Sequence, residues 1–230
     1  GAAASRLIGE TWGQRCPYNI MYSVKEIFYT LQGEGAQSGR AAVFCRFSGC
    51  NLWSGREEDR LSADCQFCDT DFVGTDGSNG GKYESPSSLA EAVEEQWLSY
   101  DLARRYVVCT GGEPLLQLDS DLIAEFHKRG FDVAIETNGT IDVPKGVDWV
   151  CVSPKGHVAV RVRQGDELKL VYPQNGVNPS KYLSWEFNHF FIQPKDGLDV
   201  DLNTELSIKF CKENPRWRLG LQTHKVIGVE

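Results

Sequence analysis

The stretch Tyr106-Val-Val-Cys-Thr-Gly-Gly-Glu-Pro114 is a short β-rich run that stops at two glycines and a proline. Such a run is typical of a strand inside a sheet. Glycine has no Cβ atom, so backbone or ligand can approach closely at Gly111 and Gly112. If the sheet is parallel, function belongs at the carboxyl ends of its strands, which is where this unusual segment lies.

Similar runs recur from Ala41 onward and alternate with helical patterns, which indicates a βα fold with a parallel sheet. The predicted strands are residues 41–47, 106–110, 131–136, 149–153, 167–171, 189–193 and 217–222. Helices are predicted behind Ser85-Pro86, from Asp119 to Gly130, and over residues 200–211. A strand-like segment starts at Tyr22, and the glycine-rich segment 75–82 is predicted to be a flexible loop.

Seven predicted strands fall short of the eight in a complete (β/α)₈ barrel, which usually needs about 250 residues. The fold class is therefore α/β, with a partial, open (β/α) barrel expected and a doubly wound sheet as the alternative. Without internal repeats or a long linker, residues 21–230 are expected to form a single domain. The only methionine is Met21, and residues 1–20 are expected to be a vector-derived leader.

The composition is that of an ordinary globular protein, because 41% of the 230 residues are hydrophobic and 24% are charged. A net charge of -8 argues against nucleic acid as a partner, since a broad basic face is missing. No apolar run approaches the roughly 18 residues that cross a bilayer, so no membrane partner is expected. These features predict a cytoplasmic protein with a small-molecule partner.

Three of the eight cysteines are distinguished by their spacing, Cys50-x14-Cys65-x2-Cys68, in a loop after the first predicted parallel strand. A Cys-x2-Cys pair in a cytosolic chain indicates metal binding or redox activity. Four others lie in predicted strands or a helix and are expected to be small buried apolar residues. They are Cys45, Cys109, Cys151 and Cys211.

Several chemistries suit such a loop. A structural zinc site wants four ligands, and the chain offers no second Cys-x2-Cys pair. A thioredoxin-like pair would open a helix, but Cys68 is followed by Asp69-Thr-Asp-Phe. Three thiolates could instead hold a four-iron cluster and leave one iron free to bind S-adenosylmethionine (SAM).

The cysteine loop, its Cys65-Gln-Phe67-Cys68 motif and the strand end Gly111-Gly-Glu-Pro114 together resemble the radical SAM superfamily. Most members space their cysteines as Cys-x3-Cys-x2-Cys, so residues 51–64 form an insertion in the cluster loop. Four further motifs are similar to the 7-carboxy-7-deazaguanine synthase family. They are Phe28-Tyr-Thr-Leu-Gln-Gly-Glu-Gly35, Phe44-Cys-Arg-Phe-Ser-Gly-Cys-Asn-Leu-Trp53, Cys68-Asp-Thr-Asp71 and Gln222-Thr-His-Lys225.

This resemblance implies a radical ring contraction that converts 6-carboxy-5,6,7,8-tetrahydropterin into 7-carboxy-7-deazaguanine with loss of ammonia, in queuosine and deazapurine biosynthesis. The enzyme would be a carbon–nitrogen lyase that uses a [4Fe-4S] cluster, SAM and Mg²⁺. An electron donor such as flavodoxin and a homodimer are also implied. Another radical SAM enzyme, such as one that makes a glycyl radical on a partner protein, is one alternative, and a zinc-binding module without catalysis is another.

The resemblance also implies roles for individual residues. The iron ligands would be Cys50, Cys65 and Cys68. The SAM contacts would be Phe67, Cys68, Asp69, Gly112, Ser153, Pro154, Lys155, Gln193, Pro194, Lys195 and Asp196. The substrate contacts would be Gln32, Gly33, Glu34, Arg46, Thr110 and Glu230, and Thr70 would serve the magnesium ion.

Three of these roles have a physical rationale. Arg46 lies in an apolar strand, where a guanidinium is costly unless it is paired. A substrate carboxylate would pair with it through two hydrogen bonds, although a buried structural ion pair would do so too. The amide of Gln32 and the carboxylate of Glu34 suit the donor and acceptor edge of a pterin. Thr70 offers a neutral oxygen to magnesium, unless it is only a turn hydroxyl.

Overall fold

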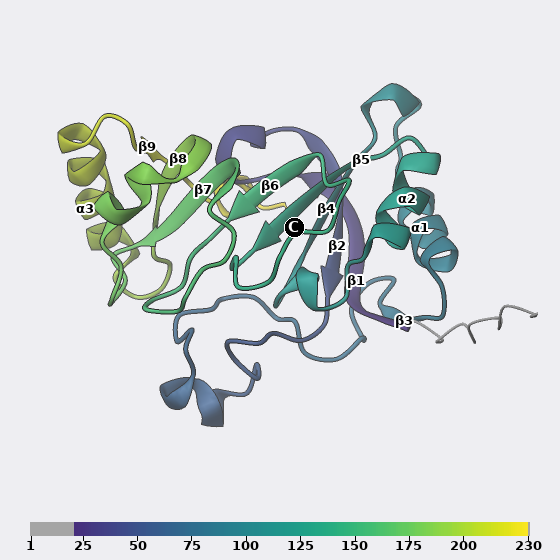
Figure 1. The fold of residues 1–230 in the computed structure, drawn as a ribbon, viewed down its shortest axis with the longest axis horizontal. Helices are drawn as coiled ribbons and strands as arrows, with labels where there is room; N and C mark the ends of the chain where they lie inside the picture. Colours follow the sequence, from purple (N-terminus) through teal and green to yellow (C-terminus); the bar gives the residue numbers. More distant parts are fainter. Residues whose placement is uncertain (1–20, 230) are drawn as a thin grey trace, which may run out of the picture.

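The computed structural model of the protein describes residues 21–229, so the expected leader and Glu230 lie outside the described residues. The chain forms a 9-stranded sheet in the order β3-β1-β2-β4-β5-β6-β7-β8-β9, which curves without closing on itself (Figure 1). The strands are β1 (Tyr22–Leu31), β2 (Ala41–Phe47), β3 (Gly81–Tyr83), β4 (Tyr106–Gly111), β5 (Asp132–Thr137), β6 (Trp149–Val152), β7 (Gln164–Tyr172), β8 (Glu186–Pro194) and β9 (Arg218–Leu219).

The strands from β2 to β9 along this order are all parallel to their neighbours, and they are the seven strands that the sequence predicts. This arrangement confirms the open partial barrel. The last predicted strand, 217–222, is too long, because β9 ends at Leu219 and Gln222 leaves the sheet to bond Glu34.

An antiparallel edge completes the sheet. Strand β1 pairs with β2 and with β3, so Gly81 and Lys82 belong to a strand and the predicted loop 75–82 is wrong at its end. The preceding loop packs against β1, and a Cβ atom on Gly80 would lie 2.2 Å from the carbonyl oxygen of Lys25. These glycines therefore allow close packing of the loop against the strand.

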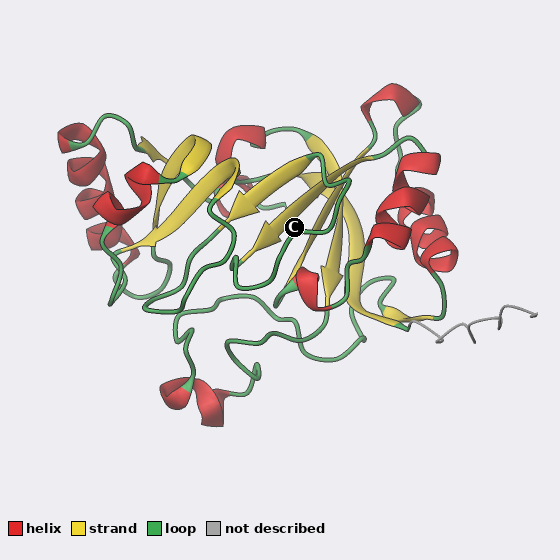
Figure 2. Ribbon diagram, viewed as in Figure 1, coloured by secondary structure: helices red, strands yellow, loops and turns green. Residues whose placement is uncertain are grey.

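Helices cover the two ends of the sheet (Figure 2). Helices α1 (Pro86–Glu95) and α2 (Ser120–Lys128) pack together beside β1 and β5, and α3 (Val200–Glu213) packs against β8 and β9. Ser85 and Asp119 cap the first turns of α1 and α2 by accepting hydrogen bonds from backbone amides, and both helices begin where the sequence predicts. No helix within residues 21–229 combines the length and apolar character needed to span a membrane.

Strand alternation decides which side chains reach the functional face. In β2, Val43 and Cys45 pack into the core cluster that α1 and α2 cover, whereas Ala42 and Phe44 join a smaller cluster on the opposite face. Arg46 is in phase with Phe44 and therefore emerges on that second face, at the carboxyl end of the strand. The same alternation puts further polar side chains there: Thr110, Glu136, Lys169 and Gln193.

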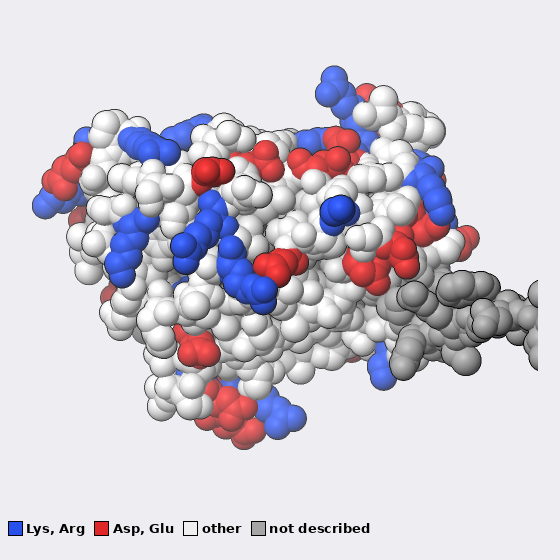
Figure 3. Space-filling view, viewed as in Figure 1, with Lys and Arg blue, Asp and Glu red and all other residues white. Residues whose placement is uncertain are grey.

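The molecular surface carries both signs of charge. Lys and Arg side chains are interspersed with Asp and Glu over the face shown in Figure 3, which agrees with a net charge of -8 and with the lack of a broad basic face there. Both signs also occur on the segment that projects at the bottom of this view, over the cysteine-loop insertion (Figure 1).

Candidate active site at the carboxyl ends of the strands

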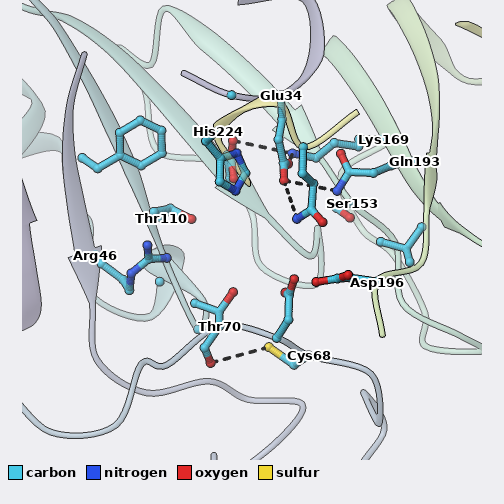
Figure 4. A pocket seen from close by; sticks show the side chains of 18 of the residues that line it. Glu34, Arg46, Cys68, Thr70, Thr110, Ser153, Lys169, Gln193, Asp196 and His224 are labelled. Atoms are coloured by element: carbon cyan, nitrogen blue, oxygen red, sulfur yellow. Dashed lines mark hydrogen bonds and ion pairs between the residues drawn. The ribbon is translucent and has the colours of Figure 1, made fainter. Parts of the chain in front are cut away.

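A polar cavity of about 350 Å³ lies at the carboxyl ends of the parallel strands (Figure 4). It brings together most of the residues that the sequence analysis selects. From the cluster loop these are Cys65, Phe67, Cys68, Asp69 and Thr70, and from the rest of the chain Gln32, Gly33, Glu34, Arg46, Thr110, Gly112, Ser153, Lys155, Gln193, Pro194, Lys195 and Asp196. Cys50 and Pro154 do not line it, and Glu230 lies outside the described residues.

The three cysteines of the loop are free thiols, and they lie close enough to influence one another electrostatically. Burial raises the pKa of Cys50, and the neighbouring charges of Glu113 and Cys68 add to the shift. Burial also raises the pKa of Cys65, with further contributions from Cys68 and Cys50. The raised pKa values favour the neutral thiols of Cys50 and Cys65, and a bound metal cluster would supply the positive charge that stabilises their thiolate forms.

The sulfurs do not form a site for a single ion. Among residues 21–229, no three Cys, His, Asp or Glu side chains converge closely enough to hold one metal ion. A four-iron cluster takes one thiolate per iron, so its ligands surround a space and need not meet at a point. The donor set of Cys50, Cys65 and Cys68 therefore fits such a cluster better than it fits a mononuclear zinc site.

The two glycines at the end of β4 allow the cysteine loop to pass close by. Gly111 has a φ of +135°, which favours glycine, and a Cβ atom on Gly112 would lie 2.2 Å from the carbonyl oxygen of Gly49 and 2.7 Å from Cys50 Cβ. The close approach predicted for this strand end is thus an approach of the backbone to the loop that carries Cys50.

Glu113, the residue after these glycines, ties the ends of β4 and β5 together. Its buried carboxylate accepts hydrogen bonds from Thr137 Oγ1 and the Asn138 amide, both at 2.8 Å, and from the Leu115 amide at 3.0 Å. Burial raises the pKa of Glu113 although these donors oppose the shift. The Asn138 side chain in turn donates to Asn51 of the cysteine loop at 2.9 Å, so the loop is anchored to β5.

A buried ion-pair network forms another wall of the cavity (Figure 4). Glu34 pairs with Lys169 and accepts from Gln222 Nε2 at 2.9 Å and Gln193 Nε2 at 3.2 Å. Lys169 also lies 3.6 Å from Glu136, which accepts from Gln32 Nε2 at 3.0 Å. Lys169, Gln222 and Gln193 thus hold the carboxylate of Glu34. A molecule bound in the cavity would share the oxygens of Glu34 with these side chains.

Electrostatics keep this network ionised. Burial would raise the pKa of Glu34, but the charge and hydrogen bond of Lys169, with smaller contributions from Gln222 and His224, lower it to about 2. Burial would lower the pKa of Lys169, but Glu136 and Glu34 hold it well above its ordinary value. The cavity therefore has a fixed charged wall at neutral pH.

Arg46 lines the cavity and also bonds to a residue of the same chain. Its Nε donates to Glu26 Oε1 at 2.7 Å, and its guanidinium lies 5.9 Å from the centre of the Phe28 ring. Within the described residues, its terminal nitrogens Nη1 and Nη2 make no hydrogen bond. The structural ion pair weighed in the sequence analysis exists, yet the end of the guanidinium fork is available to an anion in the cavity.

The C-terminal segment covers the cavity from the other side. Lys225, in helix α4 (Thr223–Ile227), donates to Asp69 at 2.7 Å and to Asp196 at 2.5 Å, and so joins the cysteine loop to the end of β8. His224 packs so tightly that a Cβ atom on Gly33 would lie 2.1 Å from its Nδ1. Lys155 and Ser153 also line the cavity, where Lys155 donates to Ser153 Oγ at 2.6 Å.

One buried atom in the cavity lacks a partner. The Oε1 atom of Gln193 makes no hydrogen bond within the described residues, although the residue is only 5% exposed. An unsatisfied buried acceptor is costly, so this site suits a ligand that donates a hydrogen bond. The observation fits the amino or hydroxyl groups of SAM, for which Gln193 is a predicted contact.

Sequence reasoning missed the cavity residues Glu26 and Lys169, and it selected Gln222 and Lys225 only as part of a motif, without a role for either side chain. The signal for Lys169 was present, because it stands between Leu168 and Leu170 in a predicted strand, as Arg46 stands among apolar neighbours. Both are charged residues on the strand face opposite the helices. The contacts of Gln222 and Lys225 carried no local signal, because they join segments far apart in the chain.

Comparison with known proteins agrees with this geometry. No protein-family model matches the chain. The 7-carboxy-7-deazaguanine synthase of Caulobacter vibrioides is 60% identical to it over 210 residues, covering 91% of this chain and 100% of that protein. The corresponding synthase of Bordetella pertussis is 59% identical over 210 residues with the same coverage. The crystal structure of QueE from Escherichia coli matches with a TM-score of 0.64 at 28% identity, over 89% of this chain and 95% of that one.

An open α/β sheet whose strand ends surround a polar cavity, beneath a loop with three cysteines, defines an enzyme of the partial-barrel class. The identity to the curated synthases extends over their full length. The chain belongs to the 7-carboxy-7-deazaguanine synthase family.

Proposed function

We propose that the protein is a carbon–nitrogen lyase that contracts the ring of 6-carboxy-5,6,7,8-tetrahydropterin to give 7-carboxy-7-deazaguanine and ammonia, in queuosine biosynthesis. The names of its relatives support this activity. The observation in the structure that carries it is the single cavity into which Cys65, Cys68 and the unpaired end of Arg46 all project. A radical source and an anchor for a carboxylate thereby share one space.

The cluster loop would hold a [4Fe-4S] cluster through Cys50, Cys65 and Cys68. When bound, the cluster and SAM together supply the carbon radical that starts the reaction. Around SAM, the chain would contribute Phe67, Asp69, Gly112, the strand end Ser153-Pro154-Lys155 and the strand end Gln193-Pro194-Lys195-Asp196. The unpartnered Oε1 of Gln193 supports this placement, because this buried acceptor could accept a hydrogen bond from SAM.

The substrate would lie between Arg46 and the charged wall. Arg46 would bind the substrate carboxylate with Nη1 and Nη2, because its Nε already serves Glu26. Gln32, Gly33 and Glu34 would recognise the pterin edge, with Thr110 as a further contact. Glu34 stays ionised beside Lys169 and can therefore only accept hydrogen bonds, which suits the N–H groups of a pterin.

Thr70 would serve a magnesium ion. Thr70 lines the cavity together with Cys68, and no group of three or more potential metal ligands lies there among residues 21–229. Magnesium usually keeps several waters and takes few protein ligands, so substrate and water would complete the coordination. Thr70 would then place the ion between the cluster loop and the substrate.

The setting of the enzyme completes the proposal. Residues 21–230 would act as one domain, in a homodimer, with an electron donor such as flavodoxin and with Glu230 close to the substrate. Seven free thiols in the described part of the chain suit the reducing cytoplasm. Family resemblance alone supports the dimer, the donor and the role of Glu230.

The decisive experiment is anaerobic incubation of the reconstituted protein with SAM, a strong reductant and 6-carboxy-5,6,7,8-tetrahydropterin, followed by mass analysis. Formation of 7-carboxy-7-deazaguanine that requires both SAM and reductant would support the proposal. Absence of this product from protein that carries a full cluster and cleaves SAM would reject it and favour another radical SAM activity.

A further inference from the structure

The insertion 51–64 contains an arginine that bonds to the backbone of the cluster motif. Arg60 Nη1 donates to the carbonyl oxygen of Gln66 at 3.0 Å and to that of Cys68 at 3.1 Å. Its Nε and Nη2 donate to the two carboxylate oxygens of Glu57 at 2.7 Å and 2.6 Å. All three guanidinium nitrogens are therefore engaged, and one of them spans the Cys65-x2-Cys68 turn.

The surroundings hold this guanidinium in place. Its central carbon lies 4.0 Å from the centre of the Trp53 ring, and Trp53 packs edge-on against Phe72 with ring centres 5.6 Å apart. The Trp53 indole also donates at 3.1 Å to the carbonyl oxygen of Arg56, the residue that precedes the 3₁₀ helix Glu57–Ser62 of the insertion. The guanidinium of Arg60 is stacked on Trp53 and paired with Glu57 along one edge. Its Nη1 donors therefore point in a fixed direction, toward the carbonyls of Gln66 and Cys68.

The separation of the cysteines explains why such a support is useful. The 14 residues between Cys50 and Cys65 leave these two cysteines without the short covalent link of a Cys-x3-Cys segment. A longer connection costs more conformational entropy when its ends are fixed. Contacts that fix the Cys65–Cys68 turn before iron arrives reduce the entropy that cluster binding must remove.

We propose that Arg60 is a positioning residue that presets the Cys65-x2-Cys68 turn for the iron–sulfur cluster, and that this is the function of the 51–64 insertion. The inference rests on the proposed function, because it assumes that these cysteines bind the cluster. Arg60 touches neither the substrate nor SAM in this account. It acts through the backbone carbonyls of Gln66 and Cys68.

The chain supplies a matched control. Arg56 lies in the same insertion, but its side chain is 71% exposed and its ion pair with Glu58 is long, at 3.7 Å. Its contacts with Trp53 and Ser54 use backbone atoms, which substitution preserves. Arg60→Lys keeps the charge but cannot reproduce the fork, and Arg60→Gln removes both, so these two variants are compared with Arg56→Lys and Arg56→Gln.

The test measures cluster retention in the full-length protein. Each protein is reconstituted anaerobically, its iron and sulfide are counted, and iron loss to a ferrous chelator is followed over time. We expect at least a tenfold faster loss from Arg60→Lys and Arg60→Gln, and the wild-type rate from both Arg56 variants. The electron paramagnetic resonance spectrum of the reduced cluster should also change in the Arg60 variants, with and without SAM.

Thermal unfolding of each protein without iron separates this effect from misfolding. If Arg60→Gln is unfolded, Arg60→Lys decides the matter: faster iron loss at a wild-type unfolding temperature supports the proposal. Wild-type retention and spectra in both Arg60 variants overturn it while leaving the proposed function intact. If the wild-type protein itself assembles no four-iron cluster, both the inference and the proposed function fail.

Discussion

Glu26 and Arg46 are direct cross-strand partners in the antiparallel pair β1 and β2, and Arg46 Nε donates to Glu26 Oε1 at 2.7 Å. Both side chains are partly buried and line the cavity. The antiparallel edge of an otherwise parallel sheet therefore orients an arginine that is itself placed by a parallel strand. Glu26 therefore orients the guanidinium through Nε, and the terminal nitrogens of Arg46 remain available to bind a ligand in the cavity.

Arg46→Lys should weaken substrate binding more than it weakens the fold. Lysine can still pair with Glu26, but it lacks the planar pair of terminal donors that a carboxylate accepts. The loss of a charge-assisted contact of this kind costs about 1.5–3 kcal/mol, roughly 10- to 150-fold in affinity. The substrate KM and the unfolding temperature measure the two effects. Glu26→Gln is the control, and an unchanged KM in Arg46→Lys would leave Arg46 as a structural ion pair only.

Glu34→Gln should remove stability in a pH-dependent way. The pKa of Glu34 is lowered from 4.5 to about 2 because the charge of Lys169 outweighs the effect of burial. A carboxyl with a lower pKa in the folded state stabilises the fold above its unfolded pKa, and this contribution disappears as the pH falls between about 4.5 and 2. Urea unfolding over this range should show wild type and variant converging. A constant difference would contradict the assignment.

At neutral pH, Glu34→Gln removes one of the two carboxylates that balance the buried positive charge of Lys169. Breaking a buried pair by removing one partner costs about 3–5 kcal/mol, and the lower end of that range is expected because Glu136 remains 3.6 Å from Lys169. Glu136→Gln is the matched variant. Its cost should be smaller, since its contact with Lys169 is longer than that of Glu34.

Alanine at Cys50, Cys65 or Cys68 should abolish the visible absorbance of a reconstituted cluster. Each thiolate would hold one iron, so the loss of any of them leaves the cluster with two protein ligands. Cys211→Ala is the control, because this cysteine lies in α3 and packs beside the core under that helix. A full complement of iron and sulfide in Cys65→Ala would reject the ligand assignment.

Thr70→Val should remove the dependence of turnover on magnesium and leave the cluster intact. Valine preserves the shape of the side chain and deletes the oxygen that would face the ion. Product formation is measured across a range of magnesium concentrations, with iron content as the parallel reading. A magnesium response equal to that of the wild type would mean that Thr70 is only a turn hydroxyl.

Gly112→Ala should disturb the cluster loop, because the added Cβ atom would lie 2.7 Å from Cys50 Cβ and 2.2 Å from the Gly49 carbonyl oxygen. Crowding of this kind costs about 1–3 kcal/mol and should lower the iron content. Gly81→Ala is the control, since the atom nearest to its new methyl group would be 3.8 Å away. Equal iron content and unfolding temperature in the two variants would contradict this account.

Much of the fold follows from local sequence. The seven parallel strands are found because each β-rich run is short and bounded by turn residues, and the first helices because Ser85 and Asp119 are strong N-caps. The antiparallel pairing of β1 with β3 was not predicted. It places Tyr22 opposite Tyr83, residues far apart in the chain, and no local pattern indicates such a pairing.

Local sequence likewise identifies some residues of the site but not those whose role depends on long-range contacts. Arg46 and the cysteine loop could be selected because their residue types are unusual where they stand. The role of Lys225 could not, because its bonds to Asp69 and Asp196 exist only after the C-terminal segment has folded back across the strand ends. The ligands assigned to individual side chains stay predictions, which the variants above are designed to test.

Strand alternation has a consequence for how the sequence can change. Deleting one residue from β7 ahead of Lys169 would rotate its ammonium toward the core under α3 and turn Leu168 or Leu170 into the cavity. The cysteine loop is free of this parity rule, since it belongs to no sheet. A change of length between Cys50 and Cys65 that keeps the contacts of Arg60 should therefore be tolerated, whereas the strands can vary only by substitution.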